Sequence, residues 1–106
     1  MKSETIKKII EFRDSRDWKQ YHSGKDLSIS ISLEASELLE IFQWSKEEVD
    51  KLDKLDSIKE ELADILIYAV MLADYYNLDL DEIIDNKLIK NLKKYPHGKK
   101  INLKEK

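Results

Sequence analysis

Residues 58–76 read IKEELADILIYAVMLADYY, and this stretch decides the fold class. Its apolar residues recur at i, i+4, i+7 and i+8, which is the spacing of one face of an amphipathic α-helix. The residues on this face are Ile58, Leu62, Ile65, Leu66, Ala69, Leu72, Ala73 and Tyr76. Asn77 is expected to end the helix. A long helix with one apolar face needs other elements to cover that face.

The segments before and after this helix also show helical spacing. Residues 3–16 are expected to form the first helix, with Ser3 as its N-cap, and residues 17–26 to form a loop. Residues 79–82 resemble a capping box that starts the last helix, and Pro96 stops this helix. The apolar residues of the last helix are Leu80, Ile83, Ile84, Leu88, Leu92 and Tyr95.

Residues 27–43 give two conflicting signals. From Leu27 to Leu33 apolar residues alternate with serine, and a period of two by itself indicates a strand. Beyond Leu33 the spacing is helical. Because a lone strand would have no partner elsewhere in this sequence, we interpret the whole segment as a helix. Residues 45–57 are almost entirely charged and are expected to form a connection.

Composition agrees with an all-α fold. The chain has 106 residues, 42% of them hydrophobic and 39% charged, with only two glycines and one proline. We expect one domain over residues 1–100, a four-helix bundle, followed by a basic, flexible tail at 101–106, and not a turn-rich β-sandwich or barrel. A chain this short buries a limited core, so homo-oligomerisation is expected to complete that core.

Several functional classes are disfavoured by what the sequence lacks. The absence of cysteine excludes disulfides, thiolate zinc sites and thiol catalysis. A net charge of −3 argues against binding a nucleic-acid polymer, which needs a basic surface. No apolar run is long enough for a membrane span, and the first residues lack the apolar core of a signal peptide. We therefore expect a soluble, cytoplasmic protein without a membrane partner.

Four carboxylates are candidate metal ligands. Glu34 and Glu37 share one helical face, and Glu61 and Asp64 repeat the same spacing on the following helix. One such pair is common on a solvated helix. Two pairs at the edge of a core favour a bound cation, because uncompensated buried carboxylates are costly. Oxygen donors favour Mg²⁺, with Mn²⁺ as the alternative, over zinc. A di-iron bundle is disfavoured because neither histidine has a glutamate three residues before it.

These carboxylates resemble the E-x-x-E … E-x-x-D signature of the MazG-like, all-α nucleoside triphosphate pyrophosphohydrolases. Further blocks, at residues 12–18, 37–44, 60–68 and 87–96, resemble the dCTP pyrophosphatase branch, so the resemblance covers about residues 5–100. It implies hydrolysis of the α–β phosphoanhydride of dCTP or a modified pyrimidine nucleotide, to monophosphate and pyrophosphate, in nucleotide pool sanitation. It also implies a homodimer, often paired into a tetramer.

The resemblance further implies roles for single residues. Glu34, Glu37, Glu61 and Asp64 would ligate Mg²⁺, and Glu37 or Glu40 would act as general base. From the residues alone, a basic stripe on the last helix would be a solvated face, and helical aromatics would be core. By resemblance, the substrate-binding residues are Trp18, His22, Lys25, Trp44, Tyr68, Lys87, Asn91, Lys94 and Tyr95.

Two positions depart from the pattern of this branch. Asp26 stands where asparagine is common, which puts a preference for cytosine in doubt, and Ser36 replaces the usual glycine.

One alternative function is a non-catalytic helical module that binds a nucleotide or a protein. The complete carboxylate set argues against it. Another is a relative acting on phosphoribosyl-ATP, against which Trp18, His22 and Trp44 argue.

Overall fold

The structure is a computed structural model that describes residues 1–44 and 54–96. Within these ranges every regular element is helical, which confirms the all-α class and the helical interpretation of residues 27–40. Residues 41–43, expected in the same helix, form turns instead. The elements are α1 (Ser3–Ser15), the short 3-10 helix η1 (Trp18–Tyr21), α2 (Gly24–Glu40), α3 (Leu55–Tyr75) and α4 (Leu80–Lys94). None of the described helices is long and apolar enough to cross a membrane. The tail expected at 101–106 and residues 45–53 of the expected connection lie outside the described residues. The expectation of a connection through residue 57 is wrong, because α3 already begins at Leu55.

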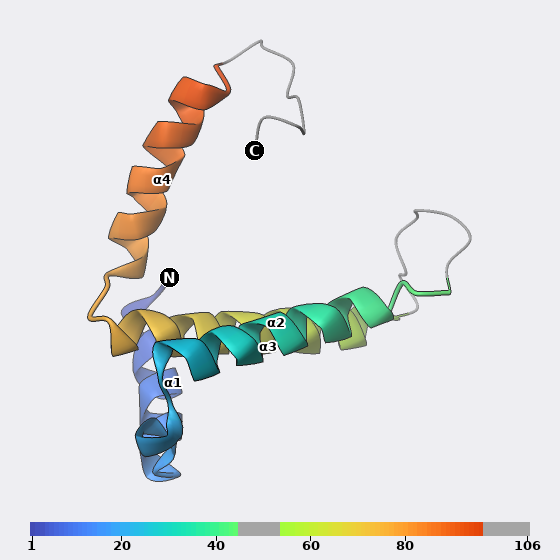
Figure 1. Ribbon diagram of the computed structural model, residues 1–106, viewed down its shortest axis with the longest axis vertical. Coiled ribbons are helices and arrows are strands. Elements are labelled where there is room, and N and C mark those ends of the chain that lie inside the picture. Colours follow the sequence, from blue (N-terminus) through green and yellow to red (C-terminus); the bar gives the residue numbers. More distant parts are fainter. Residues whose placement is uncertain (45–53, 97–106) are drawn as a thin grey trace.

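Helices α2 and α3 lie side by side and antiparallel, and α1 crosses the end of this pair where α2 begins and α3 ends (Figure 1). The core is concentrated at this crossing. A buried arginine, Arg13 of α1, donates a hydrogen bond of 2.7 Å to the carboxylate of Asp74 on α3. This charged contact fixes the crossing of α1 and α3. The buried apolar residues there are Leu27, Val70, Met71 and Ala73.

Helix α2 begins earlier than the sequence analysis predicted, so the expectation of a loop through residue 26 is wrong. Ser23 is the N-cap: its hydroxyl accepts the Asp26 backbone N–H at 3.1 Å and donates to the Asp26 carboxylate at 2.8 Å. This reciprocal pair satisfies a free N–H of the first turn. The ring of Tyr76 lies so close to Gly24 that a Cβ at residue 24 would overlap it.

The other helix ends give mixed results. The expected cap of the last helix is confirmed, because the Asp79 side chain accepts the backbone N–H of Glu82 at 3.1 Å. The expected cap of the first helix is wrong, because Ser3 is already helical and Lys2 precedes it without a side-chain cap. Helix α3 ends at Tyr75. Asn77, which was predicted to end the helix, follows with a positive φ of 56°.

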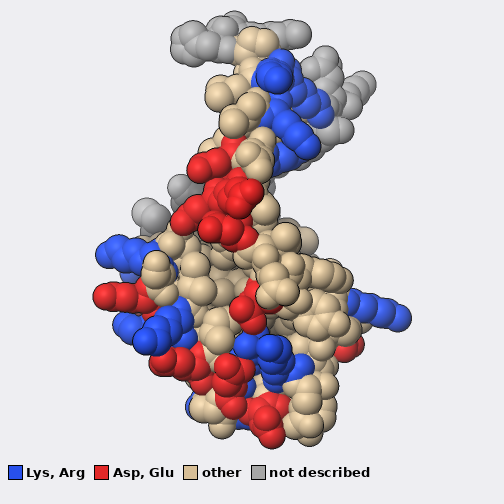
Figure 2. All heavy atoms as spheres, turned by 90° about the vertical axis from the view of Figure 1, so that its left-hand side faces the viewer, with Lys and Arg blue, Asp and Glu red and all other residues tan. Residues whose placement is uncertain are grey.

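Helix α4 extends away from the other three helices (Figure 1). The radius of gyration is 16.7 Å, whereas a compact domain of this length has one of about 13 Å. The apolar residues predicted for its buried face are therefore largely exposed within a single chain. Figure 2 shows acidic side chains gathered where α4 begins and basic side chains towards its end.

Candidate metal centre

The interface between α2 and α3 is built from one stripe of residues on each helix, spaced by four and three. Glu34 and Glu61 stand in these stripes, at positions that a helix pair normally gives to apolar residues. Their carboxylates are thereby held between the two helices, and burial there needs compensation. The stripes are Leu27, Ile31, Glu34 and Leu38 on α2, and Glu61, Ile65, Tyr68 and Leu72 on α3.

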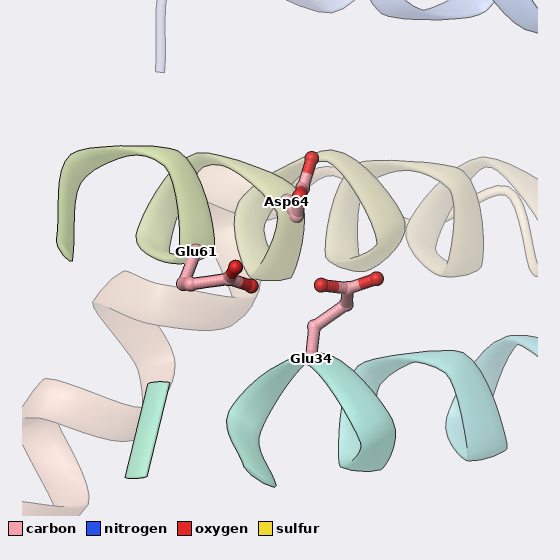
Figure 3. Close-up of side chains that lie close together, drawn as sticks. All are labelled: Glu34, Glu61 and Asp64. Atoms are coloured by element: carbon pink, nitrogen blue, oxygen red, sulfur yellow. The ribbon is translucent and has the colours of Figure 1, made fainter. Parts of the chain in front are cut away.

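The four predicted carboxylates meet in this interface. Glu34 projects from α2 towards α3, and Glu61 projects from α3 into the same space (Figure 3). One oxygen from each of Glu34, Glu61 and Asp64 lies within 4.8 Å of the others. Glu37 belongs to the same cluster because its carboxyl group interacts with those of both Glu34 and Glu61. The helical spacing of the two pairs therefore brings these carboxyl groups together in one cluster.

The electrostatics of the cluster are unfavourable without a cation. Burial, followed by the neighbouring Glu37 carboxyl, raises the pKa of Glu34 to about 7. The Glu37 carboxyl, followed by burial, raises the pKa of Glu61. Oε2 of Glu34 and Oε2 of Glu61 are buried, and neither has a hydrogen-bond partner among the described residues. Orphaned, converging carboxylate oxygens are the donor set that a hard divalent cation takes, so the site fits Mg²⁺ or Mn²⁺.

Tyr68 is the predicted substrate-binding residue that lies nearest in sequence to the cluster, one turn beyond Asp64 on α3. The predicted binding residues near the start of α2 do not reach the cluster within one chain. Lys25, in the first turn of α2, lies roughly 14 Å along the helix axis from Glu34, and His22, just before α2, lies farther away. Trp18, in η1, packs edge-on against Phe12 with ring centroids 5.4 Å apart.

The remaining predicted binding residues lie beyond the other end of α2 or on α4. Trp44 follows α2 and is 86% exposed. Lys87, Asn91 and Lys94 lie on α4 and Tyr95 caps it, with the Lys94 ammonium 5.4 Å from the centre of the Tyr95 ring. Because α4 extends away from the helix pair, a single chain does not bring these residues to the carboxylates (Figure 1).

Glu40 has a different environment from Glu37. It lines a surface hollow of about 520 Å³ at the end of α2. The other lining residues are Ser36, Leu39, Phe42 and Gln43. Leu39 in this hollow is 71% exposed, so this part of α2 is turned away from α3. Of the two candidates for the general base, Glu37 is the one that contacts the carboxylate cluster.

The sequence analysis assigned no role to Arg13, which the structure buries at the crossing of α1 and α3. Its guanidinium also lies near His22, and burial, followed by Arg13, lowers the pKa of this histidine. His22 Nδ1 is buried without a hydrogen-bond partner among the described residues. A signal for Arg13 was present in the sequence, because it follows Ile6, Ile9 and Ile10 at the spacing of a buried helix face.

A two-helix carboxylate cluster of this kind agrees with the family comparison. The model of the MazG-like family matches residues 29–106. The chain belongs to the MazG-like family. This MazG-like chain is 33% identical over 99 residues to dCTP pyrophosphatase 1 of Rattus norvegicus and of Homo sapiens, and 35% identical to that of Bos taurus. The matches with the rat and human proteins cover 88% of this chain but only 58% of those relatives.

A solved structure is matched over a larger share of its own length. The crystal structure of a pyrophosphatase from Archaeoglobus fulgidus superposes with a TM-score of 0.79 and 42% sequence identity. The match covers 88% of this MazG-like chain and 90% of that chain. The arrangement of helices described above is therefore that of a known pyrophosphatase structure.

Proposed function

We propose that this MazG-like protein is a Mg²⁺-dependent nucleoside triphosphate pyrophosphohydrolase that cleaves the α–β phosphoanhydride. The observation that carries the proposal is the pair of buried, unpartnered carboxylate oxygens of Glu34 and Glu61 in a cluster with Asp64. An acidic cluster repels a polyanionic triphosphate, so it suits this substrate only when a cation lies between the two. Similarity to dCTP pyrophosphatases and to a solved pyrophosphatase supports the reaction class.

Glu34, Glu37, Glu61 and Asp64 are the residues that would hold the metal ion. A bound Mg²⁺ supplies charge neutralisation for the phosphate oxygens and lowers the pKa of a coordinated water. The contribution of the chain is to keep these carboxylates converged, because they come from two helices whose packing fixes their separation. We assign the general base to Glu37, because it contacts the cluster while Glu40 lines a separate hollow. Hydrolysis consumes one water, whose proton Glu37 would accept.

The preferred substrate is proposed to be dCTP or a modified pyrimidine nucleotide, as the names of the mammalian relatives suggest. The negative charge of Asp26 is not a strong argument against a pyrimidine substrate. The Asp26 carboxylate accepts a hydrogen bond from the Ser23 hydroxyl, and the Asp26 backbone N–H donates to the same hydroxyl oxygen, so Asp26 serves to cap α2. Tyr68 lies beside the cluster. The other proposed binding residues lie on parts of the chain far from it, so we propose that a homodimer, or a dimer of dimers, gathers them.

The direct test is a panel of ribonucleoside and deoxyribonucleoside triphosphates incubated with the full chain and Mg²⁺. Products are separated by anion-exchange chromatography and identified by ³¹P NMR. Monophosphate and pyrophosphate in equal amounts support the proposal, with cytidine and modified pyrimidine nucleotides turned over fastest. Release of orthophosphate, or binding without turnover at any Mg²⁺ or Mn²⁺ concentration, would overturn it.

A matched pair of variants tests the metal ligands. Glu61→Gln removes a charged ligand while keeping the shape of the side chain, so we expect turnover to fall by at least about 100-fold with helicity by circular dichroism unchanged. Glu60→Gln changes the neighbouring, exposed residue and should leave turnover nearly unaltered. Full activity of Glu61→Gln would remove Glu61 from the mechanism.

A further inference from the structure

The buried arginine of α1 is a costly way to join two helices. The Arg13 side chain is 4% exposed, and its guanidinium is shared between a carboxylate of α1 and one of α3. Nε donates to Asp14 at 3.0 Å, and Nη1 donates to Asp74 at 2.7 Å. Buried ion pairs can often be replaced by apolar residues without loss of stability. The crossing of α1 and α3 therefore does not by itself explain why residue 13 is charged.

His22 lies beside this guanidinium and has one ring nitrogen turned inwards. Its Nδ1 is buried and has no hydrogen-bond partner among the described residues. The side chain as a whole is half-buried, so the other ring nitrogen, Nε2, is the one that reaches the surface. The backbone is also fixed, because the His22 N–H donates to the Lys19 carbonyl at 3.1 Å and the next residue, Ser23, caps α2. The inward nitrogen is thus held in a defined position.

Two charged groups face His22 in the described part of the chain, and they act in opposite directions. Burial is the largest cause that lowers the pKa of His22. Arg13 of α1 lowers this pKa further, and Asp26 of α2 raises it by less. The Asp26 carboxylate is already engaged, because it accepts the Ser23 hydroxyl at 2.8 Å. The surroundings of the imidazole therefore favour its uncharged form.

The same arrangement decides which nitrogen carries the proton of the uncharged ring. Because Arg13 is itself buried, the buried Nδ1 lies on its side of the imidazole. A proton on Nδ1 would be a buried donor without an acceptor, and it would turn the positive end of an N–H bond towards a cation. With the proton on Nε2, His22 turns a lone pair towards that cation instead. The guanidinium thus favours the proton on the accessible side of the ring.

We propose that Arg13 is a positioning residue for substrate binding, which acts by holding His22 uncharged with its proton on Nε2. His22 then meets the substrate as a neutral hydrogen-bond donor. Such a donor suits a carbonyl or hydroxyl oxygen of the nucleoside, whereas phosphates are better matched by charged groups. This role rests on the proposed function, because it takes His22 as a substrate-binding residue. The state of the imidazole, in contrast, can be measured without any turnover.

NMR of the ¹⁵N-labelled full chain reports the protonation of His22 directly. The chemical shift of each ring nitrogen shows whether that nitrogen carries a proton, and a titration between about pH 5 and 8 gives the pKa. The chain has two histidines, so His97→Gln leaves the imidazole signals of His22 alone. With Arg13 in place we expect the proton on Nε2 and a pKa below the 6.5 of an unperturbed histidine.

Substitutions of Arg13 test whether its charge is the cause. Arg13→Met removes the charge but keeps a long side chain, so the pKa of His22 should rise and the form with the proton on Nδ1 should appear. Arg13→Lys keeps a positive charge and should keep this pKa low. The matched control is Arg16→Met, because Arg16 lies at the end of α1 with its guanidinium over the Phe12 ring and should not affect His22.

Asp74→Asn separates the electrostatic effect from a loosening of the helix crossing. It leaves Arg13 held by Asp14 and removes a compensating negative charge, so the pKa of His22 should not rise. Equal rises in Arg13→Met and Asp74→Asn, or no rise in Arg13→Met, would overturn the proposed role. Should Arg13→Met alone fail to fold, the double variant with Asp74→Asn leaves no unpaired carboxylate on α3, and its His22 should have a higher pKa than in Asp74→Asn.

The pH dependence of hydrolysis gives the functional readout. At saturating Mg²⁺, the profile of kcat/KM should contain an ionisation that moves to higher pH in Arg13→Met and disappears when His22→Gln is added. Identical profiles of the unaltered chain and Arg13→Met would overturn the role in substrate binding. Absence of turnover in the unaltered chain would overturn the proposed function, whereas the imidazole signals would still decide whether Arg13 controls His22.

Discussion

The carboxyl group of Glu34 links protonation, stability and metal binding at a single residue. In the folded chain its pKa is raised to about 7, above the 4.5 of an unperturbed glutamate. Between these two values the folded state holds a proton that the unfolded state has lost. The metal-free protein is therefore most stable below the lower value and loses stability as pH rises through the upper one. A metal ion needs the ionised form, so its affinity should rise over the same window.

This pH dependence can be measured by thermal unfolding with and without Mg²⁺. We expect the increase in Tm caused by a fixed Mg²⁺ concentration to be larger at pH 8 than at pH 6. In Glu34→Gln the metal-free protein should lose less stability as pH rises through this window, because the titrating group is gone, and the Mg²⁺ effect should shrink. An effect of Mg²⁺ that is the same at both pH values would contradict the assignment of Glu34 as a ligand.

At the scale of elements, the end of α3 determines where α4 begins. Asn77 has a φ of 56°, its N–H donates to the Asp74 carbonyl at 3.1 Å, and Leu78 N–H donates to the Ala73 carbonyl at 2.8 Å. These are the two bonds of a Schellman motif, whose left-handed residue is usually glycine and sometimes asparagine. The direction of the chain after α3 thus depends on one residue that tolerates a positive φ.

Substitution of Asn77 should separate this backbone effect from side-chain chemistry. Asn77→Ala is expected to lower the free energy of unfolding by about 1 kcal/mol, because an alanine Cβ is strained at positive φ. Asn77→Gly should be neutral or stabilising. Asn86→Ala, the same change inside α4, should be neutral or slightly stabilising, because alanine favours helix. Urea unfolding of the three variants checks these values, and equal stability of Asn77→Ala and Asn86→Ala would refute the capping role.

The elements also show what a sequence can and cannot reveal here. The carboxylates of Glu34 and Glu61 were predictable because helical spacing alone places them at a core edge. The start of α2 was missed although Ser23 and Asp26 form a recognisable capping pair, since the serine-rich alternation that follows resembles a strand. The position of α4 was not predictable, because an amphipathic helix specifies which face is buried but not which partner buries it.

At the scale of the whole molecule, the proposed homodimer would make stability depend on protein concentration, because the apolar faces of α4 are exposed in separate chains. If two chains bury these faces together, unfolding is coupled to dissociation, and a hundredfold increase in concentration adds roughly 2.7 kcal/mol to the stability of the dimer. We therefore expect Tm, measured by calorimetry, to rise with concentration. Leu88→Asp, if monomeric, should instead show a constant Tm, as a chain that unfolds alone does. A Tm of the unaltered chain that does not change with concentration would contradict the proposed homodimer, because unfolding would then not be coupled to dissociation.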